Sequence, residues 1–253
     1  MCAHIYKPNY PKVNKMKHNL IKKNLILPTT VLLGGFFLSS SAYAQFSGVT
    51  WTRDYSNSPT QDKSGSGNTP STSGATNNLG TYTFRISTSS TSGTQRQEWK
   101  YERRDGYMQM QTQFTISSDD DDFDRIALAQ NHDDQTGSEG VFSIYQVRKD
   151  GDSYVFGVQG ETTDADNGYS NFDTVEIELD KEYRLKLRSY VAGTDDSVEI
   201  AELYDGSTRI WREEIEGGGD VEGYYKIGVY KLTSGYGPVT ASFRNTRFWT
   251  GSN

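Results

Sequence analysis

Apolar and polar residues alternate with a period of two along most of residues 80–249, and clusters of Gly, Asp, Asn and Ser interrupt the alternation. Helical periodicity is nearly absent. The pattern predicts twelve strands, at residues 80–87, 95–103, 107–116, 125–132, 142–148, 154–159, 174–179, 183–190, 198–204, 208–215, 224–232 and 239–249. Many short strands joined by tight turns are typical of an all-β sandwich or barrel.

Residues 1–44 differ from the rest of the chain. They contain six lysines and no acid, then an apolar run at 25–38 and the small residues that lead to Ala44. A basic start, a short apolar run and a small-residue end predict a secretory signal peptide. The apolar run is short for a membrane span of about 20 residues, although an uncleaved anchor is the alternative. We therefore expect a secreted protein, extracellular or periplasmic, that is free of the membrane after cleavage.

Removal of this segment changes the charge and the reactive residues. The whole chain has a formal charge of −7, and residues 45–253 keep 20 of the 26 basic residues and all 33 acids, which gives −13. The single cysteine, Cys2, and two of the three histidines leave with the segment, so His132 alone remains. A cysteine nucleophile and a Cys/His metal centre are excluded from residues 45–253. The acidic balance argues against a nucleic-acid partner.

The domain organisation predicted for residues 45–253 is a single domain in one monomeric chain. Residues 49–55 can pair as a strand, and residues 56–78 are rich in Ser, Thr, Gly and Asn. We interpret 56–78 as a surface loop, with a linker between 45–79 and a main domain at 80–253 as the alternative. We expect no cofactor; the acidic segments 119–122 and 164–168 leave structural calcium as a minor option.

Three predicted strands carry polar residues at alternate positions. In the first, Arg96, Glu98 and Lys100 share one face. In the second, Gln130 and His132 share one face. Histidine titrates near neutral pH, so His132 is the natural general base.

The third strand reads Tyr-Tyr-Lys-Ile-Gly-Val-Tyr from residue 224 to residue 230. Tyr224, Lys226 and Tyr230 point to one side, which we interpret as the outward face. Gly228 leaves a gap on that face where a ligand can approach.

Together the three motifs resemble the alginate lyase family, polysaccharide lyase family 7, which shows Arg-x-Glu-x-Arg, Gln-x-His and Tyr-x-Lys-x-Gly-x-Tyr strands in this order. The resemblance implies a β-jelly roll sandwich, concanavalin A-like, with a concave substrate cleft. It also implies cleavage of a uronate polymer by β-elimination, with alginate as the first substrate. Lys100, Asn131 and Ile227 depart from the family pattern, and these changes bear on which uronan is cleaved.

The resemblance also implies roles for the residues. Arg96 and Gln130 neutralise the sugar carboxylate, His132 takes the C5 proton, and Tyr230 protonates the leaving oxygen or acts as both base and acid. Four further residues are expected to bind the acidic polysaccharide: Glu98, Lys100, Tyr224 and Lys226. No metal-binding residue is expected.

Two expectations concern the surroundings of the cleft. Gln109, Gln111 and Gln113 alternate along one strand, and we expect them to line the same cleft. Because a chain at −13 repels a polyanion, we expect basic residues in the cleft and acids mostly on the opposite face.

Other functions remain open from the residues alone. The enzyme can be a lyase for glucuronan, ulvan or another uronan. A non-catalytic carbohydrate-binding module on the same sandwich would use aromatic platforms among Trp51, Trp99, Trp211 and Trp249. A jelly-roll hydrolase is a distant alternative, because the acids at 176–182 do not show its usual carboxylate spacing.

Overall fold

The computed structural model describes residues 45–56, 60–64, 71–73, 81–86, 96–102, 105–118, 123–133, 141–161, 169–171, 173–191, 197–217, 223–232 and 238–253. The predicted signal peptide and the two acidic segments at 119–122 and 164–168 lie outside the described residues. Within these ranges no helix is long and apolar enough to cross a membrane.

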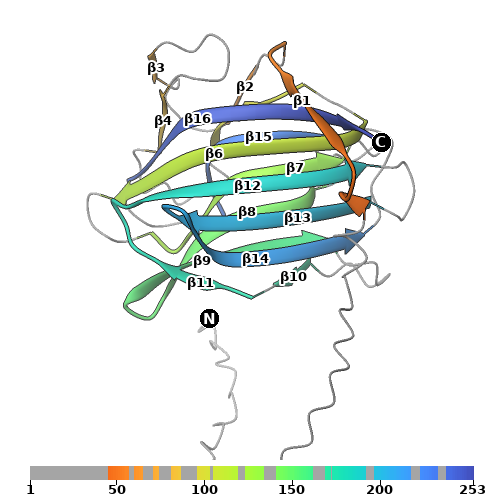
Figure 1. The fold of residues 1–253 in the computed structure, drawn as a ribbon. Coiled ribbons are helices and arrows are strands. Elements are labelled where there is room, and N and C mark those ends of the chain that lie inside the picture. The colour runs from red at the N-terminus through yellow and green to blue at the C-terminus, as the bar shows by residue number, and fades with distance from the viewer. Residues whose placement is uncertain are drawn as a thin grey trace, which may run out of the picture. The chain divides into compact units, whose positions relative to one another are not determined.

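The described strands form two antiparallel sheets that pack face to face (Figure 1). Sheet A has the order β14-β13-β12-β6-β16-β4-β3, with β1 paired to β16. Its strands are β1 Thr50–Asp54, β3 Ser71–Ser73, β4 Thr81–Ile86, β6 Gly106–Ser118, β12 Glu182–Val191, β13 Ser197–Asp205, β14 Thr208–Gly217 and β16 Val239–Ser252.

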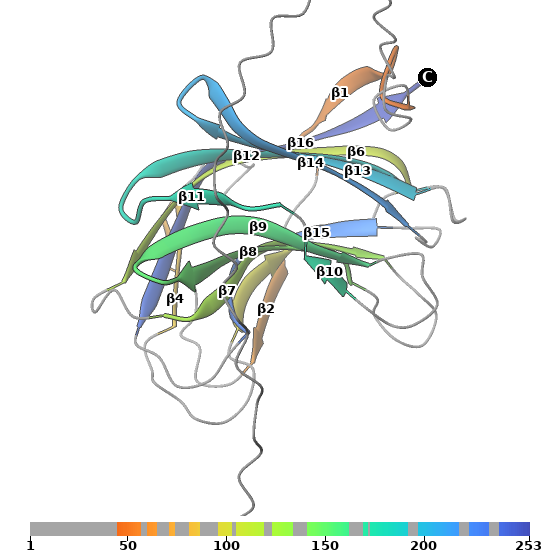
Figure 2. The same cartoon turned by 90° about the horizontal axis from the view of Figure 1, so that it is seen from below.

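Sheet B has the order β10-β9-β8-β7-β15-β5-β2, with β11 paired to β9. Figure 2 shows its strands β7, β8 and β9 bowed, with the concave side turned away from sheet A. Its strands are β2 Thr60–Ser64, β5 Arg96–Lys100, β7 Arg125–Asp133, β8 Val141–Asp150, β9 Ser153–Glu161, β10 Tyr169–Asn171, β11 Val175–Ile177 and β15 Gly223–Lys231.

The predicted sandwich and all twelve predicted strands are confirmed, with small shifts at their ends. The interpretation of 56–78 as a loop was wrong in part, because β2 and β3 lie within it. These polar segments are strands at the edges of the two sheets, where β2 pairs with β5 and β3 pairs with β4. Backbone pairing holds such an edge strand, so its sequence need not alternate.

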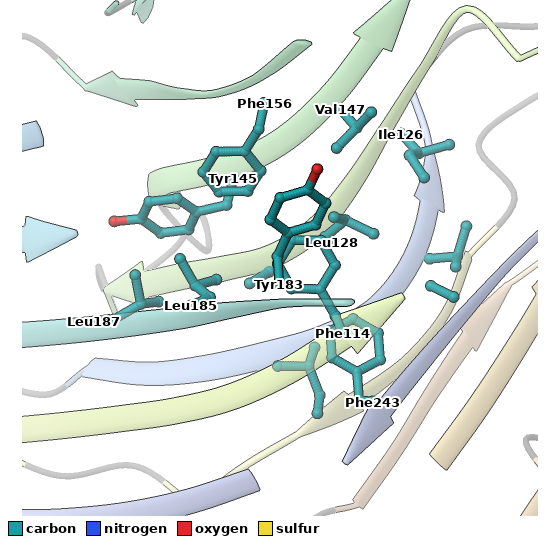
Figure 3. Packing of buried hydrophobic residues seen from close by; sticks show 14 of the residues in the cluster. Phe114, Ile126, Leu128, Tyr145, Val147, Phe156, Tyr183, Leu185, Leu187 and Phe243 are labelled. Carbon is teal, nitrogen blue, oxygen red and sulfur yellow. The ribbon is translucent and has the colours of Figure 1, made fainter. Parts of the chain in front are cut away.

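The alternating apolar residues meet between the sheets in one core. Phe114 of sheet A lies 6.1 Å from Phe156 of sheet B and 6.3 Å from Phe243, measured between ring centroids. Figure 3 shows these rings with Leu185 and Leu187 of β12. Full burial of each such side chain contributes about 1.5–3 kcal/mol, so this interior holds the two sheets together.

The N-terminal part of the described chain, residues 45–54, also packs on the outer face of sheet A. Phe46 and Trp51 lie against Tyr107 of β6, with ring centroids 6.0 and 6.4 Å apart. Ile200 completes this second, smaller apolar cluster. Residues 45–54 therefore belong to the sandwich, and they cover one end of its outer surface.

A carboxylate lies in the core between the sheets. Glu199 on β13 has no exposed surface, and it accepts hydrogen bonds from Asn131 at 2.7 Å, Ser189 at 2.6 Å, Ser143 at 2.5 Å and the Tyr145 phenol. Glu199 and Ser189 belong to sheet A, and the other three belong to sheet B. Both carboxylate oxygens are satisfied, and the network ties the two sheets together.

This network lies directly under an irregularity in sheet B. The pairing of β7 with β8 shifts at Asn131 and His132, which face Ser143 and Val141 respectively. Since Asn131 and Ser143 both donate to Glu199, the buried carboxylate holds the two strands where the shift occurs. It therefore fixes the backbone that carries His132.

We predict that Glu199→Gln lowers the free energy of unfolding by about 1–3 kcal/mol at low pH, because the amide nitrogen brings two hydrogens to a position that accepts hydrogen bonds, where a protonated carboxyl brings only one. Burial raises the pKa of Glu199, and the hydrogen bonds from Ser143, Ser189, Tyr145 and Asn131 oppose this. The folded chain thus holds this proton more tightly than the unfolded chain does. The stability contributed by Glu199 is therefore largest below its ordinary pKa and is lost as pH rises through the raised value.

Urea unfolding from about pH 4 to about pH 8 checks this, because the stability lost in Glu199→Gln should shrink as pH rises through that window. Glu176→Gln, at an exposed acid, is the control. A loss that stays constant or grows with pH would contradict the prediction.

Candidate active site

The three motif strands are neighbours in sheet B, with β15 between β7 and β5. The register pairs His132 with Tyr224, and it pairs Gln130 with Lys226, which in turn faces Lys100. Further along, Tyr230 faces Arg96 and Gly228 faces Glu98. The structure thus places all eight predicted site residues on three adjacent strands, although they span residues 96–230 of the sequence.

These residues share the face of sheet B that is turned away from the core, and most of them are covered. Gln130, His132 and Glu98 are nearly fully buried, and Tyr224 and Lys226 are 0% and 1% exposed. Tyr224 and Lys226 thus lie on the predicted outward face of the strand, but their side chains are covered and not accessible. Arg96, Lys100 and Tyr230 keep partial exposure and are the accessible part of the face.

A hydrogen-bond chain links the first two motifs. Nε2 of His132 lies 2.8 Å from Oε1 of Gln130, and Nε2 of Gln130 donates to Oε1 of Glu98. An ionised carboxylate only accepts, so Glu98 turns the amide nitrogen of Gln130 toward itself and the amide oxygen toward His132. That oxygen also only accepts, so Nε2 of His132 carries the proton. In the neutral ring the lone pair is then on Nδ1.

Gly228 makes room for this chain of contacts. Its φ is +150°, and a Cβ there would lie 2.3 Å from the carbonyl oxygen of Gln97. The glycine is required by the close approach of the β5 backbone, which is a reason the sequence did not reveal. With no side chain at this register, Gln130 on β7 can reach Glu98 on β5 across β15.

Tyr224 fixes the ring of His132. The two rings are stacked with centroids 5.0 Å apart and planes 6° apart. Nζ of Lys100 lies 4.0 Å from the centroid of Tyr224, and Nζ of Lys226 lies 5.9 Å from it. These cation–π contacts order the ring and gather positive charge near the histidine.

Tyr230 lies at the other end of the face, beside Arg96. Tyr230 is six positions beyond Tyr224 on β15 and pairs with Ala127, five positions from His132 on β7, so about 16 Å of strand separates His132 from Tyr230. The phenol next to His132 is therefore that of Tyr224. His132 and Tyr230 can act on one sugar only if the sugar lies between them, over Gly228.

The prediction that Gln109, Gln111 and Gln113 line this cleft was wrong. They are on β6, which belongs to sheet A and pairs with β12 and β16. Period-two alternation identifies the face of a strand, but it does not identify the sheet to which the strand belongs.

Sequence reasoning also missed Glu199 and the inward role of Asn131. Both are polar residues at inward positions of alternating strands, next to apolar residues such as Ala129 and Ala201. A polar residue at an inward position is the signal that predicts a buried partner. Among the residues that the structure describes, no group of three or more His, Cys, Asp and Glu side chains could hold a metal ion.

No model of a known protein family matches the sequence, and no curated protein matches it. Solved structures do match. The endo-β-1,4-glucuronan lyase of the fungus Trichoderma reesei is 13% identical, with 79% of this chain and 94% of that chain covered and a TM-score of 0.55. The alginate lyase of Klebsiella pneumoniae is 12% identical, with 73% and 85% covered and a TM-score of 0.51.

A third similar structure is the exolytic family 7 alginate lyase of Zobellia galactanivorans, 12% identical, with 69% of this chain and 85% of that chain covered and a TM-score of 0.50. At these identities the similarity establishes the fold. The predicted jelly-roll sandwich is confirmed.

We predict that the neutral imidazole of His132 carries its proton at Nε2, and that Glu98→Gln produces a mixture of the two tautomers. The amide that replaces the carboxylate can donate as well as accept, so it no longer orients Gln130. Nitrogen-15 NMR of the labelled imidazole reports the tautomer, with the signal assigned by its loss in His132→Asn. Glu178→Gln, at an exposed acid, should leave the tautomer unchanged. A wild-type ring protonated at Nδ1 would contradict the hydrogen-bond assignment.

Proposed function

We propose that this chain is a secreted polysaccharide lyase that cleaves a uronate-containing polymer by β-elimination, with alginate as the first candidate substrate and glucuronan as the second. One observation carries the proposal. Neighbouring strands of one sheet hold two accessible cations, a phenol and a histidine whose Nδ1 has the lone pair. This set contains the groups that β-elimination from a uronate requires. The fold gives independent support, because lyases for glucuronan and alginate have the same sandwich.

The carboxylate of the reacting sugar is the first obstacle to the reaction. The C5 proton is weakly acidic while the neighbouring carboxylate is negative, and neutralising that charge stabilises the enolate-like transition state. We place the sugar over Gly228, where Arg96 lies on one side and Gln130 on the other. The guanidinium offers a planar fork for a carboxylate. Gln130 uses one amide hydrogen for Glu98 and keeps the second for the sugar.

The proton transfers follow from this placement. Nδ1 of His132 is covered in the free chain, so substrate binding must open a path to it. Nδ1 then takes the proton from C5, and the electron pair of that bond forms the C4–C5 double bond. The bond from C4 to the glycosidic oxygen breaks, and Tyr230 gives its phenolic proton to that oxygen. The products are a chain with a new end at that oxygen and a chain with an unsaturated sugar at its end.

The charge distribution is compatible with a polyanionic substrate. Residues 45–253 carry −13, but salt screens this repulsion beyond about 8–10 Å at physiological ionic strength. Arg96 and Lys100 are partly exposed on the site face. A polymer bound there lies closer to these two cations than the screening distance. Local attraction by these two cations therefore governs the approach of the polymer.

A non-catalytic carbohydrate-binding module is the second candidate. Trp99 and Trp211 are each 6% exposed and pack in the core, so they offer no platform to a sugar. Trp51 and Trp249 are partly exposed but lie on sheet A. The site face thus has no exposed tryptophan among the described residues. A binding module would therefore use sheet A and would leave the polar groups of the site face without a role.

We predict that incubation with alginate produces unsaturated sugars, seen as rising ultraviolet absorbance from the C4–C5 double bond. Glucuronan, ulvan and a neutral glucan are tested in parallel, and the neutral glucan should give no signal because it has no carboxylate. Absence of the new absorbance with every uronan would reject the lyase. Retained binding to alginate in that case would favour the module.

We predict that His132→Ala and Tyr230→Phe each lower kcat by about 10²-fold or more, the usual contribution of a general base or acid. Tyr224→Phe keeps the ring that stacks on His132 and should lower kcat much less. Far-ultraviolet circular dichroism checks that each variant is folded. If Tyr224→Phe stops turnover and Tyr230→Phe does not, the proton donor is Tyr224 and the sugar lies at the His132 end of the face.

A further inference from the structure

The outer face of sheet A carries an ordered set of cations and amides. Its three central strands, β12, β6 and β16, lie side by side (Figure 1). Their outward residues align in three cross-strand rows, which we call the basic grid. The rows are Arg184–Gln113–Arg244, Lys186–Gln111–Arg247 and Arg188–Gln109–Trp249.

The charge of this grid is only partly neutralised by the chain. Arg188 pairs with Glu202 at 3.1 Å, and Arg244 pairs with Glu182. Arg184, Lys186 and Arg247 form no ion pair with a residue that the structure describes. We had expected acids on the face opposite the site, and for the basic grid this was wrong.

Repulsion between the cations marks them as a concentrated positive surface. Burial lowers the pKa of Lys186, and the charges of Arg188 and Arg184 lower it further, while Glu202 opposes them. Burial and the charge of Arg247 lower the pKa of Arg53, which lies on β1 beside the grid. Although residues 45–253 have a net charge of −13, these cations lie close together at a cost in free energy, and a polyanion would remove that cost.

The neutral members of the grid suit a sugar polymer. The side-chain amide of Gln111 is partly exposed and makes no hydrogen bond with a described residue, so it can bind a hydroxyl group, whereas Gln109 is buried. Trp249 is partly exposed, and the Arg53 guanidinium lies 5.0 Å from its ring centroid. Rows two residues apart on a strand are separated by about 6.6 Å, so three rows extend over about 13 Å. This length accommodates a short stretch of polymer.

From this arrangement we propose that the basic grid is a second binding surface for acidic polysaccharide, separate from the site face on sheet B. The identity of the ligand rests on the proposed function. Arginine forks bind the carboxylates, the Gln111 amide binds a hydroxyl, and the Trp249 ring packs against a sugar face. Because the grid and the site face are on opposite sheets, polymer bound at the grid leaves the reacting face open.

The test compares two triple variants in a His132→Ala background, which prevents cleavage of the ligand. The grid variant is Arg184→Gln, Lys186→Gln and Arg247→Gln. The control variant removes the same charge at ion-paired positions, with Lys181→Gln, Arg209→Gln and Arg212→Gln. The probe is sodium alginate, and dextran and phosphatidylglycerol vesicles are the comparison ligands. Thermal unfolding establishes that both variants are folded.

We expect the grid variant to bind alginate at least about tenfold more weakly than the parent, and the control variant to bind within about twofold of the parent. The affinity of the parent should fall steeply with added salt, as for other polyanions. Equal alginate affinities for the two triple variants would overturn the proposal. A grid variant that loses vesicle binding and keeps alginate binding would also overturn it, because the surface would then serve lipid.

The result of this binding test is independent of whether the chain proves to be a lyase. Weaker alginate binding by the grid variant, in a chain that cleaves no uronan, would sustain this surface and reject the proposed activity. If the parent chain cleaves alginate and the two triple variants bind it equally, the proposed activity is supported and the second binding surface is rejected.

Discussion

The site depends on the pairing of β15 with β7 on one side and with β5 on the other. This pairing alone brings together residues that are as much as 134 positions apart, from Arg96 to Tyr230. Gly228 is essential to it, because a side chain there would collide with the β5 backbone. The same glycine leaves the space in which Gln130 meets Glu98. One backbone constraint thus produces both the sheet and the arrangement of its polar face.

Below that face the core contains a second set of polar contacts. Glu199 reaches from sheet A to Asn131 and Ser143 of sheet B, at the position where the pairing of β7 with β8 shifts. Residues 131 and 132 point to opposite sides of one strand, so the network inside the sandwich and the His132 ring outside it share a backbone. The departure at Asn131 from the family pattern is therefore a packing feature of the core. The Asn131 side chain points to Glu199, away from the site face.

Most of the architecture was predictable from local pattern. Period-two alternation located twelve strands, and the polar alternation located the three motifs that become neighbours. Strands β2 and β3 were missed because their polar sequences pair only through the backbone at sheet edges. The burial of Tyr224 and Lys226, and the placement of β6 in sheet A, depend on long-range pairing that no short segment encodes. Glu199 needed a partner that is 68 residues away in sequence.

The two outer faces of the sandwich thus have different relations to an acidic polymer. Sheet B presents Arg96, Lys100 and Tyr230 above a buried histidine, and sheet A presents the basic grid. The most direct measurement is a crystal structure of the Tyr230→Phe variant with a short oligouronate bound. We expect a sugar over Gly228, with its carboxylate against Arg96 and its C5 proton facing Nδ1 of His132. An oligouronate seen only on sheet A, or one whose carboxylate points away from Arg96, would contradict it.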